Sequence, residues 1–309
     1  MTDAAPLPFT SHTDSFPSHG VSCAATVYRP TSTTGATTPV IVMAHGFGAV
    51  RALRLPAYAE RFAAAGYTVV TFDYRGFGDS AGTPRQVLDI SMQHQDWAAA
   101  LDYARRLYGV DPARVVAWGP SFAGGHVLTL AGRGEPLAAV IAQVPHVSGP
   151  AAARATGIAA AARLAPHAVR DQVRALLGRT PIYIPAAGVP GSTAAMTSPD
   201  AVPGADRLKA DSGLESGDFR EDVAARIILK IGTYSPHRIA NKITCPVLFQ
   251  IAERDAITPA RIARRAAAKI DGSTVHTYDC GHFDPYVEPT FSTVVADQLA
   301  FLAKHVPTQ

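Results

Sequence analysis

Long apolar runs and a secretory leader are both missing from the sequence. No segment approaches about 18 consecutive apolar residues without a charge, Gly or Pro, so we expect no membrane-spanning helix. Near the N-terminus, Asp3 and two prolines occur where a signal peptide would need basic residues and an unbroken apolar stretch. Export by that route is therefore not expected, and the expected location is cytoplasmic.

Cysteine is scarce, and the sequence contains no long run of consecutive Lys or Arg residues. Cys23, Cys245 and Cys280 are odd in number, widely spaced and without a CxxC pair, which predicts neither a disulfide framework nor a zinc site. The net charge of +3 comes from 28 basic residues scattered among 25 acidic ones, with no basic run to bind phosphates. We therefore expect reduced thiols, no metal and no nucleic-acid partner.

Apolar residues, in contrast, are abundant. They form 47% of the chain and charged residues 17%, a composition typical of a folded globular protein. A mean hydropathy of +0.08 is too low for a protein with several spanning helices. The 309 residues are enough for one large α/β domain or for a core with an insertion.

Short apolar runs alternate with helical patterns along most of the chain. Strands are expected at 20–28, 40–44, 68–72, 114–118, 138–144, 247–252 and 274–278. Helices are expected at 53–65, 89–107, 122–131, 259–270 and 291–305. Continuous runs such as VIVMA indicate strands buried on both faces. The alternation predicts an α/β fold with a mostly parallel central sheet flanked by helices.

The alternation stops between residues 148 and 240, where Ala-rich helical stretches are interrupted by prolines and glycines. We interpret this segment as an inserted helical lid rather than a second independent domain. The expected organisation is a first part of the core at 1–147, the lid at 148–240 and a second part of the core at 241–309.

The strongest chemical signal is the sequence GPSFAGG at 119–125, between an expected strand and an expected helix. A serine on a sharp strand-to-helix turn projects its hydroxyl from the sheet edge, and crowding at the turn requires small neighbours. Ser121 is therefore the candidate nucleophile. The alternative, a Gly-rich turn capped by serine, accounts less well for the strand and helix on either side.

A serine hydroxyl needs a base to remove its proton and a carboxylate to orient that base. His282, in a Gly-His turn just after the last strand, is the expected base. Asp255 is the expected acid because it follows the strand VLFQIA, at the end where loops of α/β sheets carry function. Glu253 is the rival acid, but its longer side chain follows the strand directly.

Eleven histidines make a chance loop histidine common, so the other candidates need separate interpretations. We assign structural roles to the remaining ones considered: His45 in a strand-ending loop, His126 and His146 in packing or a pocket wall, and His237 and His305 at the surface. A tetrahedral oxyanion also needs backbone donors. The expected donors are the N–H groups of Phe47, in the sequence HGFG at 45–48, and of Phe122, at a helix N-terminus.

Together, HGFG, DYRGFGDS (73–80), GPSFAGG, AERDAITP (252–259) and CGHFDPY (280–286) resemble the α/β-hydrolase superfamily over nearly the whole chain. Within it, DYRGFG, the helix with Gln95-Asp96-Trp97 and the segment VPHVSG resemble a group that includes polyketide transferases and X-prolyl dipeptidyl peptidase-like hydrolases. The resemblance implies an acyl-enzyme mechanism without a cofactor. It also implies thioester-bound polyketide acyl groups, which members of this group in biosynthetic clusters cleave or transfer. No P-loop, no GxGxxG after a strand and no HExxH is found.

The sequence therefore predicts a serine hydrolase that cleaves a carboxylic ester or thioester of a small molecule. The apolar content of the expected lid suggests an apolar acyl pocket. An acyltransferase with the same triad is the first alternative, because water and another acceptor would deacylate the same intermediate. A peptidase and a non-catalytic binding protein are the further alternatives, and fold alone does not exclude the last. The sequence makes no prediction of oligomeric state.

Overall fold

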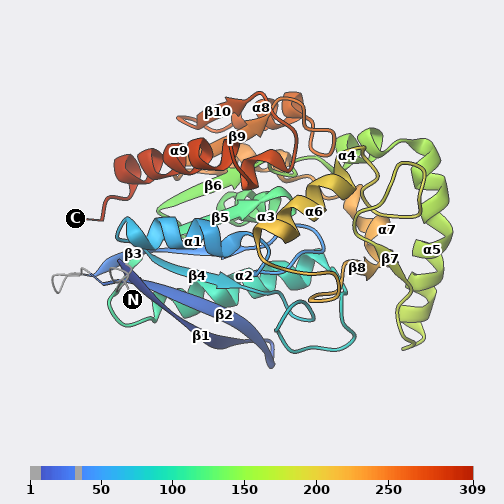
Figure 1. Cartoon of the computed structure of the whole chain (residues 1–309), viewed down its shortest axis with the longest axis horizontal. Coiled ribbons are helices and arrows are strands. Elements are labelled where there is room, and N and C mark those ends of the chain that lie inside the picture. Colours follow the sequence, from blue (N-terminus) through green and yellow to red (C-terminus); the bar gives the residue numbers. More distant parts are fainter. Residues whose placement is uncertain (1–7, 32–36, 309) are drawn as a thin grey trace, which may run out of the picture.

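An eight-stranded sheet forms the centre of the protein in the computed structural model, which describes residues 8–31 and 37–308 (Figure 1). The strand order is β1-β2-β4-β3-β5-β6-β9-β10. The strands are β1 (Phe9–Ser18), β2 (Val21–Pro30), β3 (Thr38–Ala44), β4 (Thr68–Phe72), β5 (Val110–Pro120), β6 (Ala139–Gln143), β9 (Val247–Ala252) and β10 (Thr274–Tyr278). β2 pairs antiparallel with β1 and with β4, and the other pairs are parallel.

Helices cover both faces of this sheet. The helices α1 (Leu55–Ala64) and α9 (Thr290–His305) pack on one face, and α2 (Ile90–Arg105), α3 (Ser121–Gly132) and α8 (Ala260–Ala267) pack on the other. Every residue of β3 is buried because its successive side chains point alternately into the two cores. The prediction of a mostly parallel sheet flanked by helices is confirmed.

One strand of the sheet was not predicted. β1 is an edge strand with mostly exposed polar side chains, so it lacks the apolar pattern that marks the inner strands. It forms a hairpin with β2 through His19 and Gly20, whose φ angles of 46° and 80° suit a tight two-residue turn. Residues 1–7, part of the segment considered as a possible signal peptide, lie outside the described residues.

The order of the strands reverses between β3 and β5. From β3 the chain continues to β4 on one side, and from β5 it continues to β6, β9 and β10 on the other side. Loops that leave the carboxyl ends of two such neighbours diverge and open a crevice, which is where ligands bind in open α/β sheets. The two Gly-rich motifs, HGFG and GPSFAGG, follow these two strands.

Residues 148–240, here called the insertion, lie at one end of the sheet (Figure 1). Its helices are α4 (Gly149–Thr156), α5 (Ile158–Leu176), α6 (Ala201–Asp211) and α7 (Ile228–Ile231). A short 3₁₀ turn directly precedes α7, at Ala225–Ile227. Two more follow it, at Pro236–Arg238 and Ala240–Lys242. The insertion also contains a two-stranded sheet of β7 (Tyr183–Pro185) and β8 (Asp222–Ala224). This sheet was not predicted, because strands of three residues are too short to show an alternating pattern in the sequence.

A buried ion pair holds the insertion together. Asp171, on α5, is fully buried and pairs with the Arg226 guanidinium, with 2.8 Å between Oδ2 and Nε. The same carboxylate accepts hydrogen bonds from the backbone N–H groups of Ile182 (2.7 Å) and Arg226 (2.9 Å). One side chain thus ties α5 to the start of the β7–β8 sheet and to the 3₁₀ turn after it.

A second buried polar cluster lies between α2, α3 and the end of the insertion. The Nε2 atom of His94 is 3.0 Å from Nδ1 of His126, and the Tyr234 hydroxyl lies 2.8 Å from the same Nδ1. Burial lowers the pKa of His94 to about 4 and that of His126 well below its usual value. Both imidazoles are therefore neutral at pH 7, and His126 has the packing role predicted for it.

The Asp171 pair predicts a large loss of stability in Asp171→Ala. The substitution leaves a largely buried guanidinium and two backbone N–H groups without partners, which should cost about 3–5 kcal/mol of the free energy of unfolding. Urea denaturation measures the change. The matched control is Asp102→Ala, which removes an exposed carboxylate 3.4 Å from Arg105 and should cost less than about 0.5 kcal/mol. Equal midpoints for the two variants would contradict the assignment.

The low pKa of His94 predicts a pH-dependent stability. The unfolded chain takes up a proton at this residue near pH 6.5, whereas the folded protein does so only near pH 4. Stability should therefore fall as the pH decreases from 6.5 to 4, by up to about 1.4 kcal/mol per pH unit for this one proton. His94→Gln should flatten the measured slope by that amount, whereas His12→Gln, on the exposed face of β1, should not. An unchanged slope in His94→Gln would refute the explanation.

Candidate active site

Ser121 occupies the turn between β5 and α3. Its φ of 50° is unusual for a residue with a side chain and places it on a sharp turn. A Cβ atom added to Gly119 would lie 2.4 Å from the carbonyl oxygen of Ala123, and one added to Gly124 would lie 2.8 Å from Pro145 Cβ. The turn therefore requires the small residues that surround the serine in the sequence.

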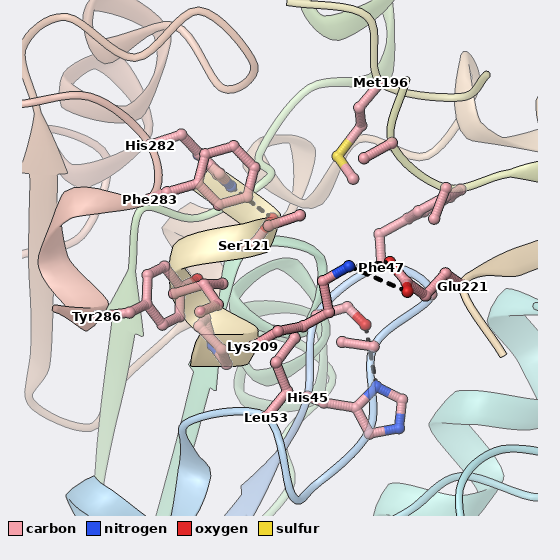
Figure 2. A pocket seen from close by; sticks show the side chains of 18 of the residues that line it. His45, Phe47, Leu53, Ser121, Met196, Lys209, Glu221, His282, Phe283 and Tyr286 are labelled. Carbon is pink, nitrogen blue, oxygen red and sulfur yellow. Dashed lines mark hydrogen bonds and ion pairs between the residues drawn. The ribbon is translucent and has the colours of Figure 1, made fainter. Parts of the chain in front are cut away.

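Three loops bring Ser121, His282 and Asp255 together (Figure 2 shows Ser121 and His282). The Nε2 atom of His282 lies 3.1 Å from Ser121 Oγ, and its Nδ1 atom lies 2.6 Å from Asp255 Oδ2. The three residues follow β5, β10 and β9, which end at the same edge of the sheet. The histidine and the aspartate are both largely buried. Each is within hydrogen-bonding distance of the next, as nucleophile, base and orienting acid would need to be.

The Asp255 carboxylate is held by its own loop. It accepts hydrogen bonds from the N–H groups of Ile257 (2.8 Å) and Thr258 (2.6 Å), and from the Thr258 hydroxyl (2.7 Å). Burial opposes ionisation, but the charge and hydrogen bond of His282 and the bonds from Thr258 lower the pKa of Asp255 overall. The rival acid, Glu253, instead pairs with Arg264 on α8.

The loop HGFG lies directly beside the serine. A Cβ atom on Gly46 would be 3.3 Å from Ser121 Cβ, and the Phe47 and Phe122 rings meet edge to face with centroids 5.8 Å apart. The two residues predicted as oxyanion donors are thus neighbours at this point, and Phe122 lies in the first turn of α3. At the turn between β5 and α3, the backbone N–H of His146 donates to the Ser121 carbonyl at 2.8 Å.

The motif DYRGFGDS supports the HGFG loop. The Asp73 carboxylate accepts hydrogen bonds from the N–H groups of Arg51 (2.6 Å) and Asp79 (3.1 Å) and forms an ion pair with Arg51. Gly78 has a φ of 47°, and a Cβ there would lie 2.3 Å from the same carboxylate. His45 is buried with its Nε2 atom 3.7 Å from Asp73, and burial lowers its pKa. These contacts agree with the structural role predicted for His45.

Among the described residues, no histidine other than His282 is within hydrogen-bonding distance of Ser121 Oγ. His146 is buried, and burial lowers its pKa to about 4 while its ring stacks on Tyr234. His237 and His305 are half-buried rather than fully at the surface, and Nδ1 of His237 is 2.7 Å from the Val147 carbonyl oxygen. The surface interpretation of these two is therefore only partly right.

An apolar pocket opens beside Ser121 between the core and the insertion (Figure 2). Its cavity volume is about 100 Å³. The core contributes the HGFG loop, Leu53, His282, Phe283 and Tyr286 to the walls. The insertion contributes Ala186, Ala187, Met196, Ala205, Leu208, Lys209, Phe219 and Glu221. Sequence reasoning assigned none of these insertion residues to a pocket wall, because no motif marks them.

One ion pair interrupts the apolar lining of the pocket. Lys209 Nζ lies 2.9 Å from Glu221 Oε2 and 3.0 Å from Asp206 Oδ1. Partial burial would lower the pKa of Lys209, but the two carboxylates raise it overall, so the ammonium stays charged. The pocket therefore combines apolar walls with one neutralised polar wall.

Among residues 8–31 and 37–308, no group of three or more His, Cys, Asp or Glu side chains could hold a metal ion. No helix in the same ranges is long and apolar enough to cross a membrane. The three cysteines are free thiols, and burial raises the pKa of Cys23 and of Cys280 to about 12.

Comparison with known proteins relates this geometry to a family. The model of the X-Pro dipeptidyl-peptidase (S15) family matches residues 19–181. A quorum-quenching protein, AidA, of Acinetobacter baumannii is 44% identical over 294 residues, which are 95% of each chain. The thiohydrolase apmlB of Arthrinium phaeospermum is 26% identical over 86% of this chain and 89% of its own.

Solved structures agree on the fold. The α/β-hydrolase GrgF from Penicillium superposes with a TM-score of 0.79 at 21% identity and covers 96% of this chain and 99% of its own. The strand order, the turn at Ser121 and the matching family model lead to one conclusion. The chain belongs to the X-Pro dipeptidyl-peptidase (S15) family of α/β-hydrolases.

Proposed function

We propose that the protein is a serine hydrolase that cleaves a carboxylic ester or thioester through an acyl-enzyme intermediate. The observation that carries this proposal is the hydrogen-bonded chain from Ser121 Oγ through His282 to Asp255, at the wall of an apolar pocket. A serine with a purely structural role does not require a hydrogen bond to an imidazole that a buried carboxylate orients, whereas a nucleophilic serine does.

In the first half of the reaction, Ser121 is acylated. His282 Nε2 takes the hydroxyl proton as Ser121 Oγ attacks the acyl carbonyl carbon. The N–H groups of Phe47 and Phe122 donate to the oxyanion of the tetrahedral intermediate, and the N-terminus of α3 favours this negative charge. The intermediate collapses when His282 returns the proton to the departing alkoxide or thiolate, and Ser121 remains esterified.

In the second half, water removes the acyl group. His282 takes a proton from water, the hydroxide attacks the Ser121 ester, and the proton returns to Ser121 Oγ as the carboxylic acid leaves. Asp255 keeps the Nδ1–H of His282 directed toward itself and stabilises the imidazolium in both steps. Its hydrogen bonds from Ile257 and Thr258 hold the carboxylate in one orientation.

The insertion is proposed to act as the lid of the acyl pocket. It supplies the apolar residues Ala187, Met196 and Phe219 to the wall opposite the core. Apolar walls favour an alkyl or aryl acyl chain. A thioester substrate is in keeping with the related thiohydrolase, and the related quorum-quenching protein adds small signalling molecules as a substrate class to test.

Two alternatives differ in the acyl acceptor and in the scissile bond. Transfer to an alcohol or amine would use the same acyl-enzyme, and product analysis with added alcohol distinguishes it from hydrolysis. Peptidase activity on a free amino terminus would need an unpaired carboxylate in the pocket. Glu221, the carboxylate among the lining residues, is already paired with Lys209.

Substitution of the three residues predicts a characteristic pattern of lost activity. With a nitrophenyl ester and an acyl thioester, Ser121→Ala and His282→Ala should each lower kcat by about a million-fold, because the residues act as a unit. Asp255→Asn should lower it by about ten-thousand-fold through the wrong imidazole tautomer. Ser292→Ala, an exposed serine on α9, is the matched control. Full activity in Ser121→Ala would reject the proposed mechanism and favour a non-catalytic site.

The pocket predicts a preference for chain length. Rates with esters and thioesters of increasing acyl length should rise until the pocket is full. Ala187→Leu adds bulk to the wall and should lower kcat/KM for long acyl chains by at least about tenfold relative to acetyl esters. Ala303→Leu, on the exposed side of α9, should leave the profile unchanged. A profile that falls steadily with length in the unmodified protein would exclude this pocket as the acyl site.

A further inference from the structure

The helix α5 carries three parallel stripes of residues. The buried stripe, Ala160, Leu164, Ala168 and Asp171, faces the rest of the insertion. The other two stripes are also spaced three and four residues apart, so each lies along one side of the helix. They are an apolar stripe of Ile158, Ala162, Ala165, Val169, Val173 and Leu176, and a basic stripe of Arg163, His167, Arg170 and Arg174.

The apolar stripe is open to solvent. Ile158 is 91% exposed, Leu176 78%, Val169 51% and Val173 50%. Within the part of the chain that the structure describes, seven of the nine exposed large hydrophobic side chains lie in the insertion. Four of these lie on α5 itself, and such a concentration on one helix marks an interaction surface rather than ordinary surface variation. Figure 1 shows α5 at the outer edge of the molecule, on the side away from the sheet.

Charge is one-sided along the same segment. Residues 148–181 contain five arginines and one acidic residue, Asp171. That carboxylate is buried and neutralised by Arg226. Arg163 and Arg170 are exposed, and the Arg174 guanidinium donates to Thr180, with its Nε 2.7 Å from the carbonyl oxygen. The surface beside the apolar stripe is therefore positively charged.

Two kinds of partner could cover an apolar stripe, and the charges favour one. A second copy of the chain, packed α5 against α5, would bring two basic stripes together without an exposed acid on either helix. The stripe also spans about 28 Å, so one helix face of about 10 Å width gives on the order of 300 Å², well below the ~800 Å² per partner of a stable interface. An anionic lipid surface avoids both the charge repulsion and the small contact area. Its phosphates attract the arginines, and its acyl region accommodates the apolar side chains.

We propose that α5 docks the protein onto an anionic membrane surface. The apolar stripe lies in the boundary between headgroups and acyl chains, and the basic stripe contacts the lipid phosphates. The helix lies in the plane of the surface and does not cross it. Asp171 connects α5 to Ile182, at the start of the chain segment that forms β7 and then the pocket wall at Ala186 and Ala187. Docking thus anchors the element beside the pocket to the lipid.

Co-sedimentation with lipid vesicles tests the proposal directly. The full-length protein should bind vesicles of phosphatidylcholine mixed with phosphatidylglycerol, should not bind phosphatidylcholine alone, and should dissociate as salt is raised. The double variants Val169→Ser with Val173→Ser, and Arg163→Gln with Arg170→Gln, should each lower the partition coefficient by at least about tenfold. Ser121→Ala should bind as the unmodified protein does, because docking does not depend on the proposed chemistry.

Matched controls lie on other faces. Val275→Ser removes an exposed apolar side chain on β10, and Arg261→Gln with Arg265→Gln removes two charges on α8, so both should bind like the unmodified protein. Circular dichroism verifies that each variant is folded. Absence of binding to the anionic vesicles would overturn the proposal. A dimer in light scattering that Val169→Ser with Val173→Ser dissociates would overturn it in favour of a second copy.

Discussion

The close approach of two loops at Ser121 is the constraint on which the rest of the site depends. The turn after β5 holds the serine at a φ of 50°, a conformation that costs about 1–3 kcal/mol for a residue with a side chain. Gly119 and Gly124 leave room for the turn, and Gly46 lets the loop after β3 contact it. The sheet makes this region rigid, because β3 and residues 115–120 of β5 are buried. The strand order also reverses between these two strands.

From that point the geometry extends outward in two directions. Toward the second part of the core, His282 and Asp255 reach the serine from loops after β10 and β9, and the Asp255 loop fixes its own carboxylate. Toward the insertion, Gly204 on α6 packs so closely on Phe283 that a Cβ would lie 2.3 Å from the ring. Residues from both parts of the chain therefore form one pocket wall beside the hydroxyl.

Sequence reasoning predicted the parts of this arrangement that depend on local patterns. Apolar runs in the sequence predict the inner strands. The small residues around Ser121 and before His282 predict tight turns at these positions, so the sequence was sufficient to identify both residues. The edge strand β1 and the pair β7–β8 have no such pattern. Met196, Lys209, Phe219 and Glu221 reach the pocket only through tertiary packing, which no spacing in the sequence reports. The stripes of α5 are visible in the sequence, but their exposure is not.

The central claim is that an acyl group is carried on Ser121 during turnover. The most direct measurement is acid quenching of the reaction with an acyl thioester, followed by peptide mass spectrometry of the protein. The account predicts that the peptide containing Ser121 gains the mass of the acyl group, and that His282→Ala abolishes the gain. Turnover without any acylated peptide, or acylation of a different residue such as Cys280, would contradict it.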